Sequence, residues 1–425
     1  MIDDFYNPEN EDELEDISQL VDKVETAFEE GSLANLKFSE EEFDLVIGHF
    51  LNEADDQIVY DLSRMAFEQH PYSADLGLKY ADVLIVNRET ERAKEILSVL
   101  LDKVPHSGDV YFLFARAFIR EDNPRLAKIS LEKASELSPE DASDMYHTAA
   151  QDSIDMNDFD NALDYLSSTV AIEGETLELL NDKAFCYERL GKFDESLKEY
   201  EKCLDEDPFN DNIWFNVGTI HARELRFDKA IEAFDFALAL NPTNSSVLYN
   251  KAIVFVNTED YNKGIETFLE FLSFEPGNLF AIIGIADAFL AIDNLVDADR
   301  YFREALVLDK DNNEANTGLS YITMLRQDHF SSLIFLRRVM GKEETDYNIL
   351  AHQLNVTFKR TMLPEFLLFY AISQFFLQNR EQFHICLEKL AVIDQLWIRK
   401  LSEIVPKLKN DKHYSAIMRK FLINN

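Results

Sequence analysis

Residues 212–242 read NIWFNVGTIHARELRFDKAIEAFDFALALNP, and the chain repeats their spacing of bulky, small and proline residues several times. Prolines recur at steps of 34 residues, at Pro71, Pro105 and Pro139 and again at Pro208, Pro242 and Pro276. Pro139 and Pro208 are 69 residues apart, which is one residue more than two steps of 34. We therefore expect a single extra residue in the turn at 139–143. A constant period of this length indicates a repeat architecture.

Each period reads as two helices. Trp214, Gly218 and His221 fall at helical intervals on one face, and Ala230, Phe234 and Ala237 do the same further along. Small residues allow two helix axes to approach closely, bulky ones fill the remaining space, and proline ends the second helix. Gly191, in the segment 190–196, suits the tight turn between paired helices because glycine accepts a positive φ. A single hairpin cannot bury its apolar face, so neighbouring hairpins must stack.

This pattern resembles the tetratricopeptide repeat family. The resemblance is close over residues 74–312, weaker over 40–71, where Ile47 replaces the small residue, and poor beyond 312. There Asn316, Thr323 and Glu344 take places that should be apolar, aromatic and proline. The resemblance implies an all-α, right-handed α-solenoid of about ten antiparallel helical hairpins. We expect an acidic N-terminal segment with one capping helix (1–39), the repeat array (40–312), and degenerate repeats with a C-terminal helical cap (313–425).

The net charge of the chain limits the classes of molecule that it can bind directly. The 425 residues hold 41 basic and 80 acidic side chains, a net charge of −39. Such a surface repels phosphate backbones and anionic lipid, so we expect neither nucleic acid nor membrane as a direct partner. Residues 1–70 hold 21 acidic and 3 basic side chains, whereas residues 396–425 hold 2 acidic and 7 basic. These opposite charges could favour contact between the two ends of different copies.

The start of the chain, MIDDFYNPENEDELED, has neither the basic region nor the apolar run of a signal peptide. The three cysteines, Cys186, Cys203 and Cys386, are too few for a disulfide framework and suit a reducing compartment. We therefore expect a cytoplasmic protein. Residues 14–28 predict one amphipathic capping helix with Leu14, Ile17, Leu20, Val21, Val24 and Phe28 on its apolar face.

In the family, the first helices of the repeats line a concave face that holds peptides. Carried over by resemblance, the positions that face this groove interleave aromatic and arginine side chains between about residues 112 and 257. The candidate partner-binding residues are Phe112, Arg116, Arg120, Phe185, Arg189, Phe215, Arg223, Tyr249 and Asn257. Aromatic and Arg side chains supply much of the binding energy at protein interfaces. This set favours a protein or peptide partner with apolar anchors and acidic groups. An alternative interpretation is that some of these side chains belong to the core, or that the chain's own C-terminal helices fill the groove.

No pattern for catalysis, a cofactor or a metal stands out. The chain has no Gly-rich phosphate loop and no nucleophile-elbow pattern. We therefore predict a non-enzymatic protein–protein interaction scaffold or adaptor without cofactor or bound metal. Two alternatives stay open. The chain could be a structural subunit that self-associates through its acidic and basic ends, or an enzyme with a site in residues 313–425, where His329, His352 and His384 lie.

Overall fold

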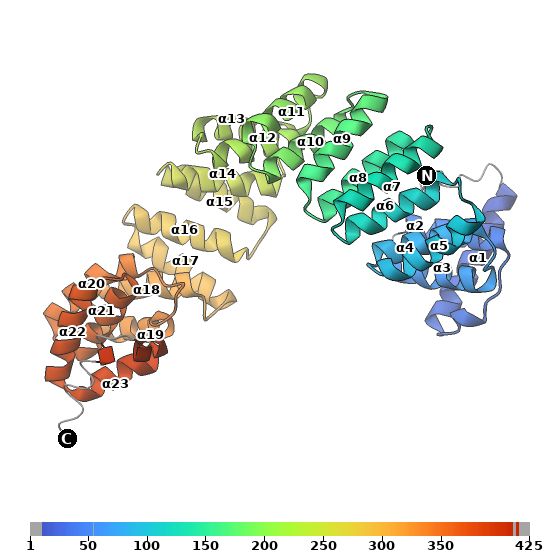
Figure 1. Ribbon diagram of the computed structural model, residues 1–425. Coiled ribbons are helices and arrows are strands. Elements are labelled where there is room, and N and C mark those ends of the chain that lie inside the picture. Colours follow the sequence, from blue (N-terminus) through green and yellow to red (C-terminus); the bar gives the residue numbers. More distant parts are fainter. Residues whose placement is uncertain (1–10, 54, 411–413, 416–425) are drawn as a thin grey trace. The chain divides into compact units, whose positions relative to one another are not determined.

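The computed structural model describes residues 11–53, 55–410 and 414–415 (Figure 1). Every regular element in this part of the chain is a helix, which confirms the all-α class. The helices form two compact units, which divide between Pro208 and Phe209. No helix among the described residues is long and apolar enough to cross a membrane.

Unit 1 contains the helices α1 (Glu11–Glu29), η1 (Leu33–Asn35), α2 (Glu40–Asn52), α3 (Asp56–Gln69), α4 (Ala74–Val86), α5 (Thr90–Lys103), α6 (Gly108–Arg120), α7 (Pro124–Leu137), α8 (Ala142–Asp155), α9 (Phe159–Glu173), α10 (Leu177–Arg189) and α11 (Phe193–Glu206). From α2 onward, consecutive helices pair into hairpins, and each hairpin packs against the next. The stacked hairpins that the repeat implies are therefore confirmed in this unit.

Unit 2 contains the helices α12 (Asp211–Arg223), α13 (Phe227–Leu240), α14 (Ser245–Asn257), α15 (Tyr261–Phe274), α16 (Leu279–Ala291), α17 (Leu295–Leu308), α18 (Asn313–Leu325), α19 (His329–Val339), α20 (Tyr347–Thr361), α21 (Pro364–Phe376), α22 (Arg380–Ile393), α23 (Gln395–Ile404) and η2 (Pro406–Asn410). Hairpins stack here too, from α12 to α19. Helix α20 lies between the hairpins α18–α19 and α21–α22.

The first helix of most hairpins begins at a repeated cap, whereas Asp141 before α8 makes no side-chain cap hydrogen bond. Ser73 and Ser107, and then Asn210, Asn244, Asn278 and Asn312, each accept a hydrogen bond from the backbone N–H three residues later. Such caps satisfy an N–H group that would otherwise lack a partner at the start of a helix. The cap thus repeats with the same 34-residue period as the prolines. Helix α8 has 14 residues, whereas α6 and α10 have 13 each. Because α8 begins at Ala142, inside the expected turn at 139–143, its additional residue lies within or beside that turn.

The turn inside each hairpin passes through the left-handed region. Gly191 has φ of +71°, as the sequence predicts. Non-glycine residues take the same conformation at the equivalent places, at Arg88, Asp122, Asn157, Leu225, Glu259, Asp293 and Gln327. The hairpin geometry therefore imposes this backbone conformation even where the side chain disfavours it.

Small residues bring the paired helices together. Ala81 on α4 and Ala93 on α5 are fully buried, as are Ala230 and Phe234 on α13. At Gly218 on α12, an added Cβ would lie 2.5 Å from the ring of Phe234. The close approach of the two helices at this point therefore depends on glycine.

Two of the three polar residues expected to interrupt the pattern after residue 312 are accommodated inside the fold, whereas Glu344 is exposed in the turn before α20. Asn316 and Thr323 on α18 are buried. The Asn316 side-chain amide donates to the carbonyl of Asn312 at 2.7 Å, and the Thr323 hydroxyl donates to the carbonyl of Leu319 at 2.6 Å. Because a buried polar group costs little once it is hydrogen-bonded, α18 still forms and packs.

At the other end, α1 buries Leu20, Val21 and Val24 against the first hairpin. Phe28 differs from the prediction, because its side chain is 37% exposed and Ala27 completes the buried face instead. The Leu14 side chain lies outside the described residues.

Candidate functional site

The first helices of successive hairpins adjoin one another within each unit, and we call them the A helices. In unit 1 they are α2, α4, α6, α8 and α10, and in unit 2 they are α12, α14, α16 and α18. All nine candidate partner-binding residues lie on A helices. The structure gives these residues different surroundings, so they cannot all contribute to binding in the same way.

Arg116 on α6 is almost completely buried, with 7% of its surface exposed. Its Nε donates to Oδ2 of Asp152 on α8 at 2.7 Å, and its Nη1 pairs with Asp82 on α4. One arginine thus joins three consecutive A helices. Burial raises the pKa of Asp82 although Arg116 acts in the opposite direction, whereas the charges of Asp82 and Asp152 raise the pKa of Arg116 despite its burial. Arg116 therefore contacts the protein's own carboxylates and offers little surface to a partner.

Arg120 is neutralised in a similar way. Its Nη2 lies 2.6 Å from Oδ1 of Asp152 and 3.2 Å from Oδ2 of Asp155. The ring of Phe112, one turn before Arg116, is half-buried and lies 5.8 Å from the Arg116 guanidinium carbon. These contacts favour a structural role for both arginines.

Arg189, at the end of α10, has a different environment. Its side chain is exposed, and its guanidinium carbon lies 5.4 Å from the ring centre of Phe159 and 5.9 Å from that of Phe185. The two rings meet edge to face at 6.1 Å. Arg189 makes no ion pair with a described carboxylate. Its charge is thus held in place by two aromatic rings while it stays available to an anionic group.

A polar group on α8 and α10 was absent from the predicted set. His147 and Gln151 on α8 both approach Oδ2 of Asp182 on α10, His147 at 3.1 Å. The hydrogen bond to Asp182 raises the pKa of His147. The repeat offered a signal for this group, because residues about one period apart become neighbours on adjacent A helices.

In unit 2, Phe215 and Tyr249 are half-buried and pack against the helices behind them. The Phe215 ring lies 6.2 Å from that of Phe234, and the Tyr249 ring lies 5.3 Å from that of Phe271. Arg223 and Asn257 are exposed at the last residues of α12 and α14. Phe215 and Tyr249 therefore serve partly as core residues and leave only part of each ring to a partner.

A group of acidic side chains lies further along unit 2, on α16, on α18 and at the start of α20. Desolvation and then the charges of Glu314 and Asp346 raise the pKa of Asp287 on α16 to about 7. Asp287 is nevertheless exposed at the surface. The surrounding protein therefore reduces the hydration of its carboxylate without covering it. Glu314 lies on α18 and Asp346 caps α20. These residues also lie outside the predicted set.

The comparison with known families agrees with this architecture. The tetratricopeptide repeat family matches at residues 108–141, 182–245 and 215–278.

Residues 108–141 and 182–278 of this chain are tetratricopeptide repeats.

Solved structures with a similar fold include MamA, at 20% identity over 40% of this chain and 93% of that chain, with a TM-score of 0.38. A tetratricopeptide repeat protein from Parabacteroides merdae is 15% identical over 59% of this chain and 98% of that chain, with a TM-score of 0.41. The C-terminal part of a repeat-containing protein from Cytophaga hutchinsonii is 16% identical over 64% of this chain and 98% of that chain, with a TM-score of 0.43. No curated protein matches the sequence.

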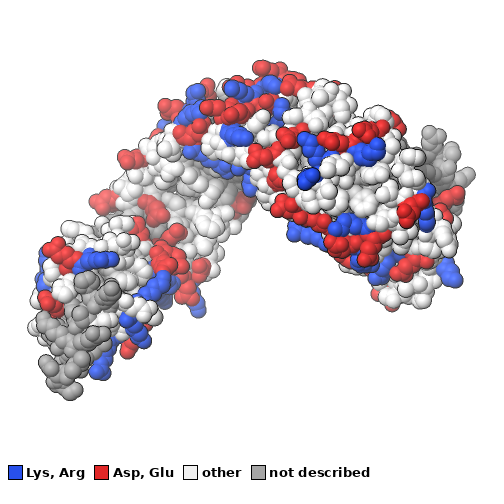
Figure 2. All heavy atoms as spheres, viewed as in Figure 1, with Lys and Arg blue, Asp and Glu red and all other residues white. Residues whose placement is uncertain are grey.

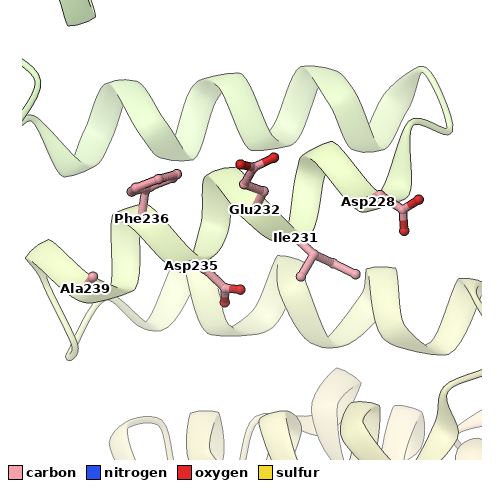
Figure 3. A pocket seen from close by; sticks show the side chains of 6 residues that line it. All are labelled: Asp228, Ile231, Glu232, Asp235, Phe236 and Ala239. Carbon is pink, nitrogen blue, oxygen red and sulfur yellow. The ribbon is translucent and has the colours of Figure 1, made fainter.

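Outside the A helices, the repeat protein has a shallow pocket on α13. Figure 3 shows its lining side chains, which all project from that one helix: Asp228, Ile231, Glu232, Asp235, Phe236 and Ala239. Three carboxylates and three apolar side chains line the pocket, and the ring of Phe236 also stacks on Trp214 at 4.7 Å. An open acidic surface on a single helix is a poor setting for catalysis, which usually needs convergent groups from several elements.

The described part of the repeat array contains no group of three His, Cys, Asp or Glu side chains that could hold a metal ion. Its three cysteines are free and buried, and burial raises the pKa of Cys186 and Cys386 to about 12 and that of Cys203 to about 11. A thiol with a raised pKa is a poor nucleophile. The cysteines are therefore structural in this conformation.

Proposed function

We propose that this protein is a non-enzymatic scaffold that binds a segment of a partner protein on the A helices of its repeats. Tetratricopeptide repeats are known for protein–protein interaction, and stacked helical hairpins supply extended surfaces for it. Acidic side chains are scattered over the visible surface, with basic ones among them (Figure 2). This charge supports a protein partner over nucleic acid or a membrane, and a reducing, cytoplasmic setting suits the free cysteines.

The observation that carries the proposal is the stacking of Arg189 on Phe159 and Phe185. Arg116 and Arg120 already have carboxylate partners, whereas Arg189 presents an oriented and uncompensated cation beside aromatic surface. Arginine beside aromatic rings is a composition typical of binding hot spots. We infer a partner segment that places a carboxylate on Arg189 and an apolar side chain against the rings.

Selection from a random displayed peptide library on the full chain tests this proposal. We expect enriched peptides to combine Asp or Glu with large apolar residues, and to bind Arg189→Glu at least about tenfold more weakly. Arg125→Glu on α7 is the matched control, because Arg125 is exposed and the substitution changes the net charge equally. Enriched peptides that bind both variants as well as the unchanged protein would exclude Arg189 as the contact.

A further inference from the structure

A groove lies between α20 and α22, away from the candidate site on the earlier A helices. Its lining includes Phe358, Lys359 and Met362 from the α20 side and Lys389, Val392 and Ile393 from α22. Its volume is about 540 Å³, within the range of about 300–1,000 Å³ that is usual for ligand sites. The groove is thus large enough to hold side chains of another segment.

The groove is unusually apolar for an exposed surface. Val392 is 80% exposed, Met362 is 67% exposed and Ile393 is 45% exposed. Leu363 and Leu396, which are close in sequence to Met362 and Ile393, are 40% and 52% exposed. Grouped apolar side chains on a surface mark interaction sites, and methionine adapts readily to the shape of a partner.

The rim of the groove is basic in a strongly acidic protein. Lys359 and Lys389 are exposed, and neither forms an ion pair with a described carboxylate. Glu388, the acidic lining residue, has His384 3.8 Å away. The groove therefore favours an occupant that combines large apolar side chains with carboxylates.

We propose that residues 1–10 of a second copy of this chain occupy the groove between α20 and α22. That segment reads MIDDFYNPEN, with Ile2, Phe5 and Tyr6 as apolar anchors, three acidic side chains and no basic one. It lies outside the described residues. The other apolar segment outside the described residues, 416–425, carries Arg419 and Lys420, which Lys359 and Lys389 would repel. The contact is a head-to-tail one and is independent of the proposed function of the A helices.

A labelled peptide of residues 1–10, titrated with the full chain, tests the groove. We expect saturable binding that weakens about tenfold or more in the variant Lys359→Glu/Lys389→Glu. The control Lys128→Glu/Lys229→Glu changes the net charge equally on exposed lysines of α7 and α13, and it should bind as the unchanged chain does. Absence of peptide binding, or equal binding by both double variants, would overturn the proposal.

Sedimentation equilibrium of the full chain tests the second copy. We expect the average mass to rise with protein concentration, and the rise to be lost in Lys359→Glu/Lys389→Glu and in Phe5→Ala/Tyr6→Ala but kept in the control. The rise should also weaken between about 0.05 M and about 0.5 M salt, because exposed charges are screened. Peptide binding without any concentration-dependent mass would show that the segment binds its own chain, and would equally overturn the proposal.

Discussion

Arg116 on α6 donates from Nε to Oδ2 of Asp152 on α8 at 2.7 Å, with 7% of the arginine and 3% of the aspartate exposed. Asp82 approaches the same guanidinium group from α4. Separating these helices would leave buried charges without partners, which is very unfavourable. The cluster therefore holds three A helices together. The candidate partner-binding residues thus fall into two groups. Some of them stabilise unit 1, and the others stay accessible to a partner.

Arg116→Met should destabilise unit 1 by about 3–5 kcal/mol, because it leaves Asp82 without its counter-charge and Asp152 with Arg120 alone. Urea unfolding followed by circular dichroism measures the loss. Arg125→Met, on the exposed face of α7, should change stability by less than about 0.5 kcal/mol. If the two variants unfolded at the same urea concentration, the cluster would contribute nothing to stability.

Gly218→Ala should destabilise the protein by about 1–3 kcal/mol, although alanine is the better helix former. The new Cβ would lie 2.5 Å from the Phe234 ring, so the paired helices must move apart. Gly48 on α2 is the matched control, because no atom lies within 4 Å of its Cβ position. Gly48→Ala should therefore stabilise by up to about 1 kcal/mol. Thermal melts compare the two, and a stabilising Gly218→Ala would contradict the helix spacing.

Asp287→Asn should remove a pH dependence of stability. The pKa of Asp287 is raised from 3.8 to about 7 in the folded protein, so the folded state binds this proton more tightly than the unfolded state does. The stabilisation is complete below about pH 4 and is lost as the pH rises through about 7. The melting temperature of the unchanged chain should therefore fall relative to Asp287→Asn between about pH 5 and about pH 8. Parallel pH profiles for the two proteins would contradict this assignment.

Much of the fold could be predicted because the repeat is local. The 34-residue step, the left-handed turn at Gly191 and the small residues at Ala230 and Gly218 all act within one hairpin or between sequence neighbours. The polar residues of α18 were harder to interpret. Asn316 looked like an interruption, yet its side chain finds a backbone acceptor one turn away.

The candidate site could be predicted only in part. The position of a residue in the repeat predicts which face of an A helix its side chain lies on, but it does not predict which residues that side chain contacts. Asp82 and Arg116 occupy the same place in successive repeats, 34 residues apart, so their opposite charges offered a signal for the ion pair. The acidic group around Asp287 offered a weaker signal, because Asp346 follows the less regular part of the array.

The sequence alone determined that the chain folds as stacked helical hairpins, because helix period, caps and turn residues are short-range properties. Only the tertiary structure decided which arginines are free. Arg116 and Arg189 look alike in the sequence, but one is enclosed by carboxylates from adjacent helices and the other stacks on Phe159 and Phe185 in contact with solvent. Charge compensation depends on distances between helices, and those distances exist only after the hairpins have packed.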